Sequence, residues 1–245
     1  MTVSKEIYIG TSGWHYQHWK GPFYPKALSD ENILDYYLKH FETAEINNTF
    51  YQLPEKETFA QWRDSAPEGF LFSVKASRYI THMKKLKDPE QPVANFIARI
   101  EVLGNNLGPV LFQLPPRWRP NIERLTSFLT TLPEDHRYAF EFRDESWFAK
   151  RTEEALRDRG AAFCIYEFEH RESPRPVTAD FVYVRLHGPD GAYQGKYDDQ
   201  TLKRWAEDIL SWVNEGKKVF CYFDNDEKGY APQNALKLKE LIGGK

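Results

Sequence analysis

Cysteine is almost absent from the sequence. Only Cys164 and Cys221 occur among the 245 residues, far apart and each inside an apolar run. This count argues against a fold held together by disulfides, and a structural or metal-binding cysteine pair is the less favoured interpretation. We expect both to be buried thiols of a protein in a reducing compartment.

Long hydrophobic segments are also missing. No apolar run approaches the roughly 20 residues of a membrane helix. The first residues, Met-Thr-Val-Ser-Lys-Glu, lack the hydrophobic region of a signal peptide. We therefore expect a cytoplasmic protein with no membrane association.

Neither sign of charge is in large excess. Lys and Arg total 33 against 36 Asp and Glu, a formal net charge of -3. This balance argues against bulk electrostatic affinity for nucleic acid, although it leaves room for a local basic pocket. A glycine-rich phosphate loop is missing as well, because Gly10-Thr-Ser-Gly13 lacks the spacing typical of a dinucleotide-binding fold.

Strand and helix patterns alternate along the whole chain. Eight strands are predicted, at residues 7–13, 43–48, 70–76, 109–115, 138–143, 161–166, 181–188 and 218–224. Helices are predicted at 29–41, 55–63, from beyond Pro92 to 103, at 121–132, 152–159, 199–214 and 234–242. This order predicts an α/β fold, a single (β/α)8 TIM-type barrel of parallel strands. With no internal repeat or linker, residues 1–245 are expected to form one domain.

The fifth strand shows how the barrel is built. In Tyr138-Ala-Phe-Glu-Phe-Arg143 the three rings point to one face, and Glu141 and Arg143 point to the other. We expect the aromatic face to be covered by helices and the charged face to open into a polar pocket at the carboxyl ends of the strands, the mouth of the barrel.

Polar residues follow the same rule at other strands. The carboxyl ends carry Ser12, Glu45, Asn47, Lys75, Ser77, Gln113, Glu141, Arg143, Arg185, His187, Asp224, Asn225 and Asp226. Such a collection is hard to explain by packing. The alternative is a salt-bridge network that satisfies itself and merely closes the barrel.

These residue types indicate acid–base chemistry on an anion. Lys75, Arg143 and Arg185 are suited to bind a phosphate or carboxylate, and Asn47, Gln113, Asn225 and Asp226 are further candidates for substrate binding. Glu141, Glu45 and His187 are the candidate catalytic acids and bases. For a lone histidine, a structural hydrogen bond is the competing interpretation.

A metal site has weaker support. No His-x-x-x-His or His-Glu-x-x-His spacing occurs, and a multi-zinc barrel needs more strand-end histidines than His187 and His82. Glu45, Glu141 and Asp224 are suited to Mg²⁺ or Mn²⁺, with neighbouring Lys and Arg as equally good partners. No cofactor is required by the sequence.

Aromatic residues are common in the loops after the strands. They include Trp14, Tyr16, Trp19, Phe50, Tyr51, Trp118, Trp147, Tyr193 and Tyr197. Rings at a barrel mouth can stack on a sugar or an unpaired base, and Trp14 and Tyr193 are our candidates for this. For most of the others we favour packing against one another.

Several blocks resemble those of the YecE-like family, also called domain of unknown function 72. They are Ile9-Gly-Thr-Ser-Gly-Trp14, Glu45-Ile-Asn-Asn-Thr-Phe-Tyr51, Phe72-Ser-Val-Lys75, Phe112-Gln-Leu-Pro-Pro116, Phe140-Glu-Phe-Arg143, Tyr183-Val-Arg-Leu-His-Gly188 and Phe223-Asp-Asn-Asp226 with Ala231-Pro-Gln-Asn-Ala235. The resemblance implies a TIM-type barrel in a bacterial cytosolic protein and supplies no reaction. The fold is similar to those of endonuclease-IV-type repair enzymes and xylose-isomerase-like sugar enzymes.

The resemblance also marks positions. The family's motif positions fall here on Glu45, Asn47, Lys75, Gln113, Glu141, Arg143, Arg185, His187, Asn225, Asp226 and Asn234. Two residues depart from it, since asparagine is expected at Asp224 and aspartate is commoner at Glu167. The detailed roles of these two positions stay open.

Three hypotheses follow. The first is an enzyme, of the hydrolase, lyase or isomerase type, acting on a small anionic molecule that is phosphorylated or sugar-derived. The second is a protein that binds or cleaves damaged nucleic acid through Lys75, Arg78 and the Lys84-Lys85 pair. The third is a scaffold without catalysis.

Overall fold

The computed structural model describes residues 6–168 and 171–243. The amino-terminal segment considered above, residues 1–5, lies outside them. Parallel strands alternate with helices in the order of a (β/α)8 barrel of the TIM type, and the predicted fold class is confirmed. None of the helices in the described ranges is long and apolar enough to cross a membrane.

The chain divides into two compact units. The first consists of the described residues of 1–45, 165–173 and 181–245, and the second of residues 46–164 and 174–180. Two strands have residues in both, β2 (Thr43–Ile46) and β6 (Ala162–Phe168). That residues 1–245 are one domain stays a prediction.

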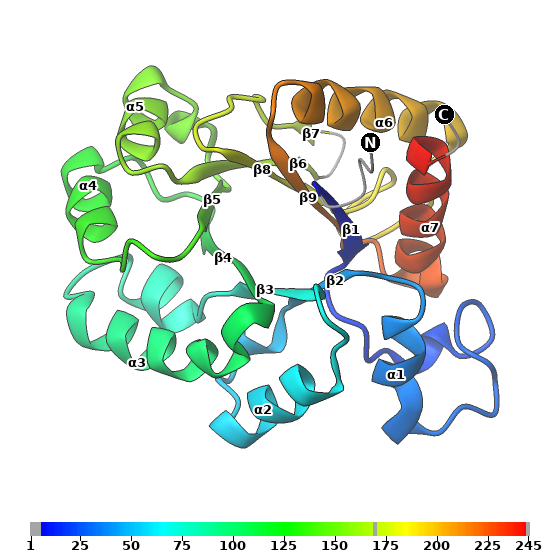
Figure 1. The fold of residues 1–245 in the computed structure, drawn as a ribbon. Coiled ribbons are helices and arrows are strands. Elements are labelled where there is room, and N and C mark those ends of the chain that lie inside the picture. The colour runs from blue at the N-terminus through cyan, green and yellow to red at the C-terminus, as the bar shows by residue number, and fades with distance from the viewer. Residues whose placement is uncertain (1–5, 169–170, 244–245) are drawn as a thin grey trace. The chain divides into compact units, whose positions relative to one another are not determined.

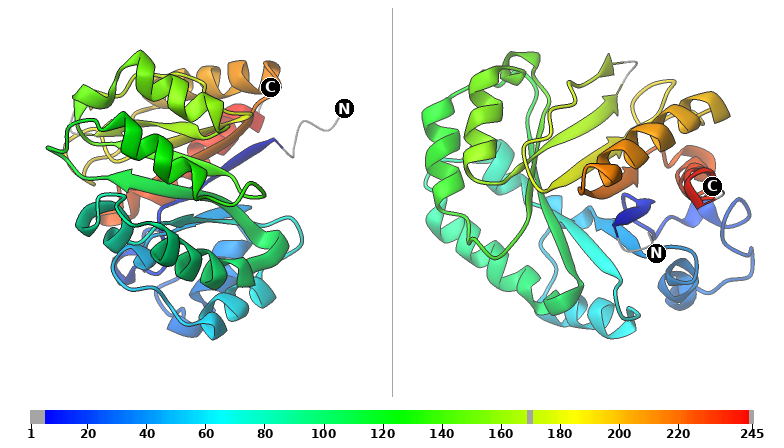
Figure 2. Two further views of the ribbon diagram at one scale, coloured as in Figure 1. Left: turned by 90° about the vertical axis from the view of Figure 1, so that its left-hand side faces the viewer. Right: turned by 45° about the horizontal axis from the view of Figure 1, so that its top comes forward.

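The first unit has parallel strands covered by two long helices. Its elements are β1 (Ile7–Thr11), α1 (Ile33–Leu38), β8 (Phe181–Leu186), α6 (Asp199–Asn214), β9 (Lys218–Phe223) and α7 (Tyr230–Gly243). Strand β9 lies between β1 and β8 and pairs with both in parallel. Helices α6 and α7 lie side by side in both Figure 1 and Figure 2. Their buried residues, among them Trp205 and Leu238, form the apolar layer against the strands.

The second unit repeats the β–α pattern. It contains α2 (Lys56–Ser65), β3 (Leu71–Lys75), α3 (Glu90–Ile100), β4 (Leu107–Leu114), α4 (Ile122–Thr130), β5 (Tyr138–Phe142) and α5 (Lys150–Asp158). Strand β4 pairs in parallel with β3 and with β5. Figure 1 shows α3 and α4 on the outer side of these strands. The ring of Phe128 on α4 lies 5.1 Å from that of Phe112 on β4 and 6.2 Å from that of Phe140 on β5, so the aromatic face of the fifth predicted strand is covered by a helix, as expected.

Several details of the predicted elements were wrong, and α1 covers only Ile33–Leu38 of the helix predicted at 29–41. Helix α3 begins at Glu90, before Pro92, and α7 begins at Tyr230 rather than Asn234, with Pro232 in its first turn. The first turn of a helix accepts proline because its N–H groups have no partner within the helix. Helix α5 begins at Lys150 rather than at residue 152. The strand β7 (Arg171–Glu172), which pairs antiparallel with the end of β6, was not predicted.

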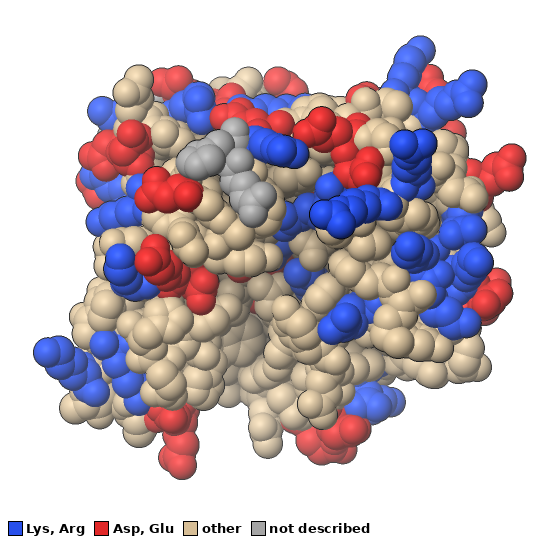
Figure 3. Space-filling view, turned by 180° about the vertical axis from the view of Figure 1, so that it is seen from behind, with Lys and Arg blue, Asp and Glu red and all other residues tan. Residues whose placement is uncertain are grey.

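Both cysteines are core residues, as expected. Cys164 and Cys221 are both buried and free. Burial raises the pKa of the Cys221 thiol far above its usual value, which keeps this residue an unreactive core group. On the face shown in Figure 3, Lys and Arg gather on the right of the view, whereas Asp and Glu are commoner at the upper left.

Candidate functional site

The carboxyl end of β8 places a buried arginine between two carboxylates. Arg185 Nη2 donates to Glu45 Oε1 at 2.8 Å and to Asp224 Oδ2 at 2.9 Å. Arg185 and Glu45 have no exposed surface, and Asp224 is 7% exposed. Isolated charges at this depth cost several kcal/mol, so each of these groups depends on its partners.

Further hydrogen bonds surround Glu45. Its Oε1 accepts from Ser12 Oγ at 2.5 Å, and its Oε2 accepts from the Tyr183 hydroxyl at 2.6 Å. Arg185 Nε adds a third donor to Oε1 at 3.2 Å. Both carboxylate oxygens of Glu45 are therefore occupied by protein donors, which fixes the position of this side chain.

His187 follows Arg185 by two residues and projects from the same face. Its Nδ1 lies 3.0 Å from Asp224 Oδ2, and its Nε2 lies 3.4 Å from Arg185 Nη1. Because the guanidinium can only donate, Nε2 must accept and Nδ1 must carry the proton that is donated to Asp224. The geometry thus places a proton on Nδ1 and leaves Nε2 in a long and weak contact.

Glycine is required directly after His187. Gly188 has φ of 118°, and a Cβ atom there would lie 2.2 Å from the backbone oxygen of Gln194. Only glycine accepts both the conformation and this approach. The residue thereby turns the chain from β8 into the loop that carries Tyr193.

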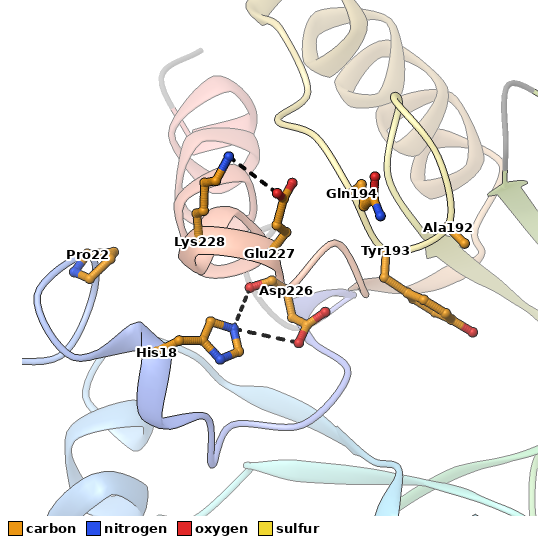
Figure 4. Close-up of a pocket in the computed structure, with 8 residues that line it drawn as sticks. All are labelled: His18, Pro22, Ala192, Tyr193, Gln194, Asp226, Glu227 and Lys228. Atoms are coloured by element: carbon orange, nitrogen blue, oxygen red, sulfur yellow. Dashed lines mark hydrogen bonds and ion pairs between the residues drawn. The ribbon is translucent and has the colours of Figure 1, made fainter.

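A hollow of about 630 Å³ opens beside this network. It is lined by His18, Pro22, Ala192, Tyr193, Gln194, Asp226, Glu227 and Lys228. Figure 4 shows His18 and Asp226 facing each other, with His18 Nε2 lying 2.8 Å from the Asp226 backbone oxygen and 3.7 Å from its carboxylate. Tyr193 is 41% exposed and offers its ring to solvent. The hollow has the size of a small-molecule site.

Electrostatics link the hollow to the buried network. Burial, followed by the negative charge of Asp224, raises the pKa of Asp226. Burial, followed by the charges of Asp224, Asp226 and Glu45, also raises the pKa of Tyr16, against the opposing effect of Arg185. Asp226 is thus a carboxyl group that holds its proton more firmly than usual at the edge of an open space.

Two asparagines hold the loop beside the hollow. Asn225 Nδ2 donates to Gly195 O at 2.8 Å and to Asn234 Oδ1 at 3.0 Å, and Asn234 bonds the backbone N–H and C=O of Tyr197. Within the described residues, Asn225 Oδ1 is buried without a hydrogen-bond partner. These contacts show a positioning role for both residues.

The second unit has its own cluster around Glu141. This buried carboxylate accepts from Gln113 Nε2 at 2.8 Å and forms a short hydrogen bond with Arg143 Nε. Cys164 Sγ lies 3.9 Å from its second oxygen. Lys75 is 7% exposed, and its Nζ lies 4.3 Å from the centre of the Phe50 ring. The predicted acid and three of its predicted polar neighbours thus belong to one unit.

His82 has a pKa that is lowered by its burial and by the positive charges of this unit. Burial, followed by the charges of Lys75, Arg78 and Arg143, lowers the pKa of His82 to about 4. The histidine is half-buried, and its ring lies edge-on to Phe50 at 5.0 Å. It is therefore neutral near pH 7 and not simply a solvated loop residue.

The other predicted site residues have varied surroundings. Asn47 is half-buried, and its Oδ1 lacks a hydrogen-bond partner within the described part of the chain. Trp14 is buried, 6.4 Å from the Tyr37 ring, and its carbonyl accepts from Tyr24. The first unit brings together Glu45, Arg185, His187 and Asp224, and the second brings together Gln113, Glu141 and Arg143. That both sets serve one site stays a prediction.

The suggested metal ligands of the first unit bind an arginine. Glu45 and Asp224 are both directed at Arg185. Within residues 6–168 and 171–243, one group of acidic and histidine side chains has ligand atoms within 4.8 Å of one another, namely Glu101, Asp135 and His136. This group precedes β5, at the amino end of the strand.

Sequence reasoning missed two residues of the first unit. Tyr183 has the same parity as Arg185 on β8 and as His187 directly after it, a signal that identifies it in retrospect. His18 belongs to a short 3-10 turn (Gln17–Trp19) and follows no strand end directly. No sequence spacing connects it with Asp226, which lies 208 residues away.

Comparison with known proteins gives consistent matches. The model of the family described as "Protein of unknown function DUF72" matches residues 8–245. UPF0759 protein YecE of Escherichia coli strain K12 is 32% identical, covering 93% of this chain and 89% of that protein. UPF0759 protein YunF of Bacillus subtilis is 27% identical over 96% and 94% of the two chains.

A solved structure agrees with these matches. The crystal structure of a DUF72 family protein from Thermotoga maritima superposes with a TM-score of 0.88 at 31% identity, covering 97% of this chain and 99% of that one. The family model, the relatives and the solved structure therefore agree. The chain belongs to the DUF72 family, which includes the YecE proteins.

Proposed function

We propose that this protein is an enzyme that acts on a small anionic molecule, phosphorylated or sugar-derived, by acid–base chemistry at the carboxyl ends of its strands. The observation that carries the proposal is the buried group of Glu45, Arg185, His187 and Asp224. Replacing such a group by apolar residues is often neutral or stabilising, so stability alone is a weak reason for its presence.

His187 is the proposed proton acceptor. Asp224 holds its Nδ1–H, so the remaining lone pair belongs to Nε2. A carboxylate that orients a histidine in this way also stabilises the imidazolium that forms when the histidine accepts a proton. Glu45 is assigned to orienting Arg185, because donors occupy both of its oxygens.

Asp226 is the proposed proton donor of the first unit. Its pKa is raised by burial and by Asp224, and it lines the open hollow together with His18. Arg185 holds two carboxylates, so its proposed role changes from binding the substrate anion to positioning these groups. Within the second unit, Lys75 and Arg143 remain proposed anion-binding cations, independently of the groups of the first unit.

A substrate screen tests the proposal. Phosphoesters and sugar phosphates are to be offered to the native protein and to the variants His187→Gln and Asp226→Asn. We expect turnover of one class, with a loss of about 100-fold or more in kcat for each variant. His40→Gln, two residues beyond the end of α1, and Asp199→Asn on α6 are matched controls that should keep full activity. Unchanged turnover in both site variants would contradict these roles.

A further inference from the structure

The segment after β3 has an unusual backbone. Residues Tyr79–Met83 form a π-helical turn, a rare element that often occurs at functional sites. Lys85, Leu86 and Asp88 follow with positive φ of 49°, 63° and 43°. Conformations of this kind cost free energy in non-glycine residues and cluster at ligand-binding sites.

A second hollow, of about 450 Å³, opens beside this turn in the second unit. Its apolar lining comes from Leu53, Tyr79, Ile80, Pro92 and Phe96, and its polar lining from Ser77, Lys84, Asp88, Gln91 and Asn95. The volume falls within the range of small-molecule sites. An apolar wall with a few polar groups is suited to a flat ring.

The turn itself carries two large exposed hydrophobic side chains. Tyr51 is 75% exposed, Tyr79 45% and Met83 67%, and together with Tyr193 of the other unit they are the large exposed hydrophobic residues of the described chain. Single exposed residues need no explanation, whereas two of these three belong to one five-residue turn. Tyr79 also lines the hollow, so its ring is available for stacking.

Uncompensated positive charge lies in the same segment. Arg78, Lys85 and Lys87 are exposed and have no acidic partner within the described residues, whereas Lys84 is paired with Asp88 at 3.1 Å. Burial first, and then the charges of Lys75, Arg78 and Arg143, lower the pKa of His82 on the same turn. An anionic group close to Tyr79 would therefore be attracted to Arg78.

The polar lining distinguishes between ring types. Gln91 Nε2 donates to Asn95 Oδ1 at 2.7 Å, and both side chains are exposed at the hollow. This pair leaves an amide oxygen on Gln91 and an amide N–H₂ on Asn95. Amides of this kind match the donor and acceptor edge of a nucleobase, whereas a sugar phosphate has no flat apolar ring for the wall.

We propose that the hollow beside Tyr79 is a binding subsite for a nucleotide, with the base stacked on Tyr79 and the phosphate held by Arg78. This assignment goes beyond the proposed function, because it concerns a separate hollow within the second unit. Binding at this subsite is measurable without turnover, so it stands or falls separately from the roles of His187 and Asp226.

Titration calorimetry at low salt tests the proposal, with adenosine 5′-monophosphate, adenosine, inorganic phosphate and ribose 5-phosphate as probes. We expect the monophosphate to bind more tightly than any of the other three. Tyr79→Ala should weaken binding at least about fivefold, the equivalent of about 1 kcal/mol of stacking. Tyr79→Phe should retain binding, because it keeps the ring. Arg78→Ala should weaken the monophosphate and leave adenosine unchanged.

A control variant and a folding check accompany the experiment, and its contrary outcomes can be stated in advance. Lys150→Ala on α5, an exposed lysine of the same unit, should bind like the native protein. Both Tyr79 and Arg78 are exposed, so unchanged thermal melting of the variants will show that they fold. No binding of the monophosphate, or binding that neither Tyr79→Ala nor Arg78→Ala alters, would overturn the proposal. Binding of a single-stranded oligonucleotide in place of the mononucleotide would also overturn it and assign the surface to nucleic acid.

Discussion

Replacing Arg185 by methionine tests how strongly the buried network of the first unit depends on its cation. The substitution keeps an unbranched side chain and removes the guanidinium held between Glu45 and Asp224. Both carboxylates would then be buried without their ion-pair partner. Removing one member of a buried ion pair costs about 3–5 kcal/mol, and we expect Arg185→Met to lower the free energy of unfolding by that amount.

Urea unfolding followed by tryptophan fluorescence measures this loss, and thermal melting provides a second readout. For a chain of this size each kcal/mol corresponds to about 2–4 °C, so the expected decrease in Tm is about 6–20 °C. Arg204→Met is the matched control. Arg204 pairs with Glu172 at 2.9 Å, and both side chains are largely exposed, so its loss should cost about 0–1 kcal/mol.

A double variant separates charge from packing. Adding Glu45→Gln to Arg185→Met removes one of the unpaired charges, so part of the lost stability should return. If Arg185→Met costs no more than Arg204→Met, the two carboxylates do not need the guanidinium, and our account of the network is refuted.

Three further predictions concern titration and capping. Because the pKa of Asp226 is raised in the folded protein, its ionisation opposes folding at neutral pH; Asp226→Asn should therefore be more stable than the native protein at pH 7, and the difference should vanish below the ordinary value of 3.8 in a pH series of unfolding curves. The pKa of His82 is lowered from 6.5 to about 4, so native stability should fall as the pH drops through this window, and His82→Gln should lose less over the same range. Asn121 accepts from the backbone N–H of Arg124 at 2.8 Å and caps α4, so Asn121→Ala should cost about 1 kcal/mol in urea unfolding, and an unchanged value would contradict the cap.

Strand parity explains why much of the site was predictable. Tyr183 and Arg185 of β8 share a face with His187, which directly follows the strand, and in β5 Glu141 points away from the face that carries Phe140. Side chains alternate along a strand, so every second residue points to the same face. Functional side chains of this fold gather at the carboxyl ends of the parallel strands. Both features depend on sequence positions only a few residues apart.

Partner choice was not predictable, because it depends on contacts between distant residues. Arg185 bonds Glu45 across 140 positions and Asp224 across 39, and no local pattern selects these two acids. The hollow of the first unit is likewise formed by three loops, one of them the 3-10 turn that carries His18. The two-residue strand Arg171–Glu172 is charged and exposed, so it shows no hydrophobic alternation.

At Asp224, the family resemblance led us to expect asparagine. Burial, and after it the charge of Asp224, raises the pKa of both Asp226 and Tyr16. Asp224→Asn keeps the size of the side chain, and its amide oxygen can still accept the Nδ1–H of His187, so the main change is the loss of one negative charge. We therefore expect the pKa of Asp226, followed by carboxyl NMR, to fall toward its ordinary value, whereas Asp198→Asn at the start of α6 should leave it unchanged. A pKa of Asp226 that is the same in Asp224→Asn as in the native protein would mean that burial without Asp224 holds the proton, and the aspartate would then have no part in tuning this acid.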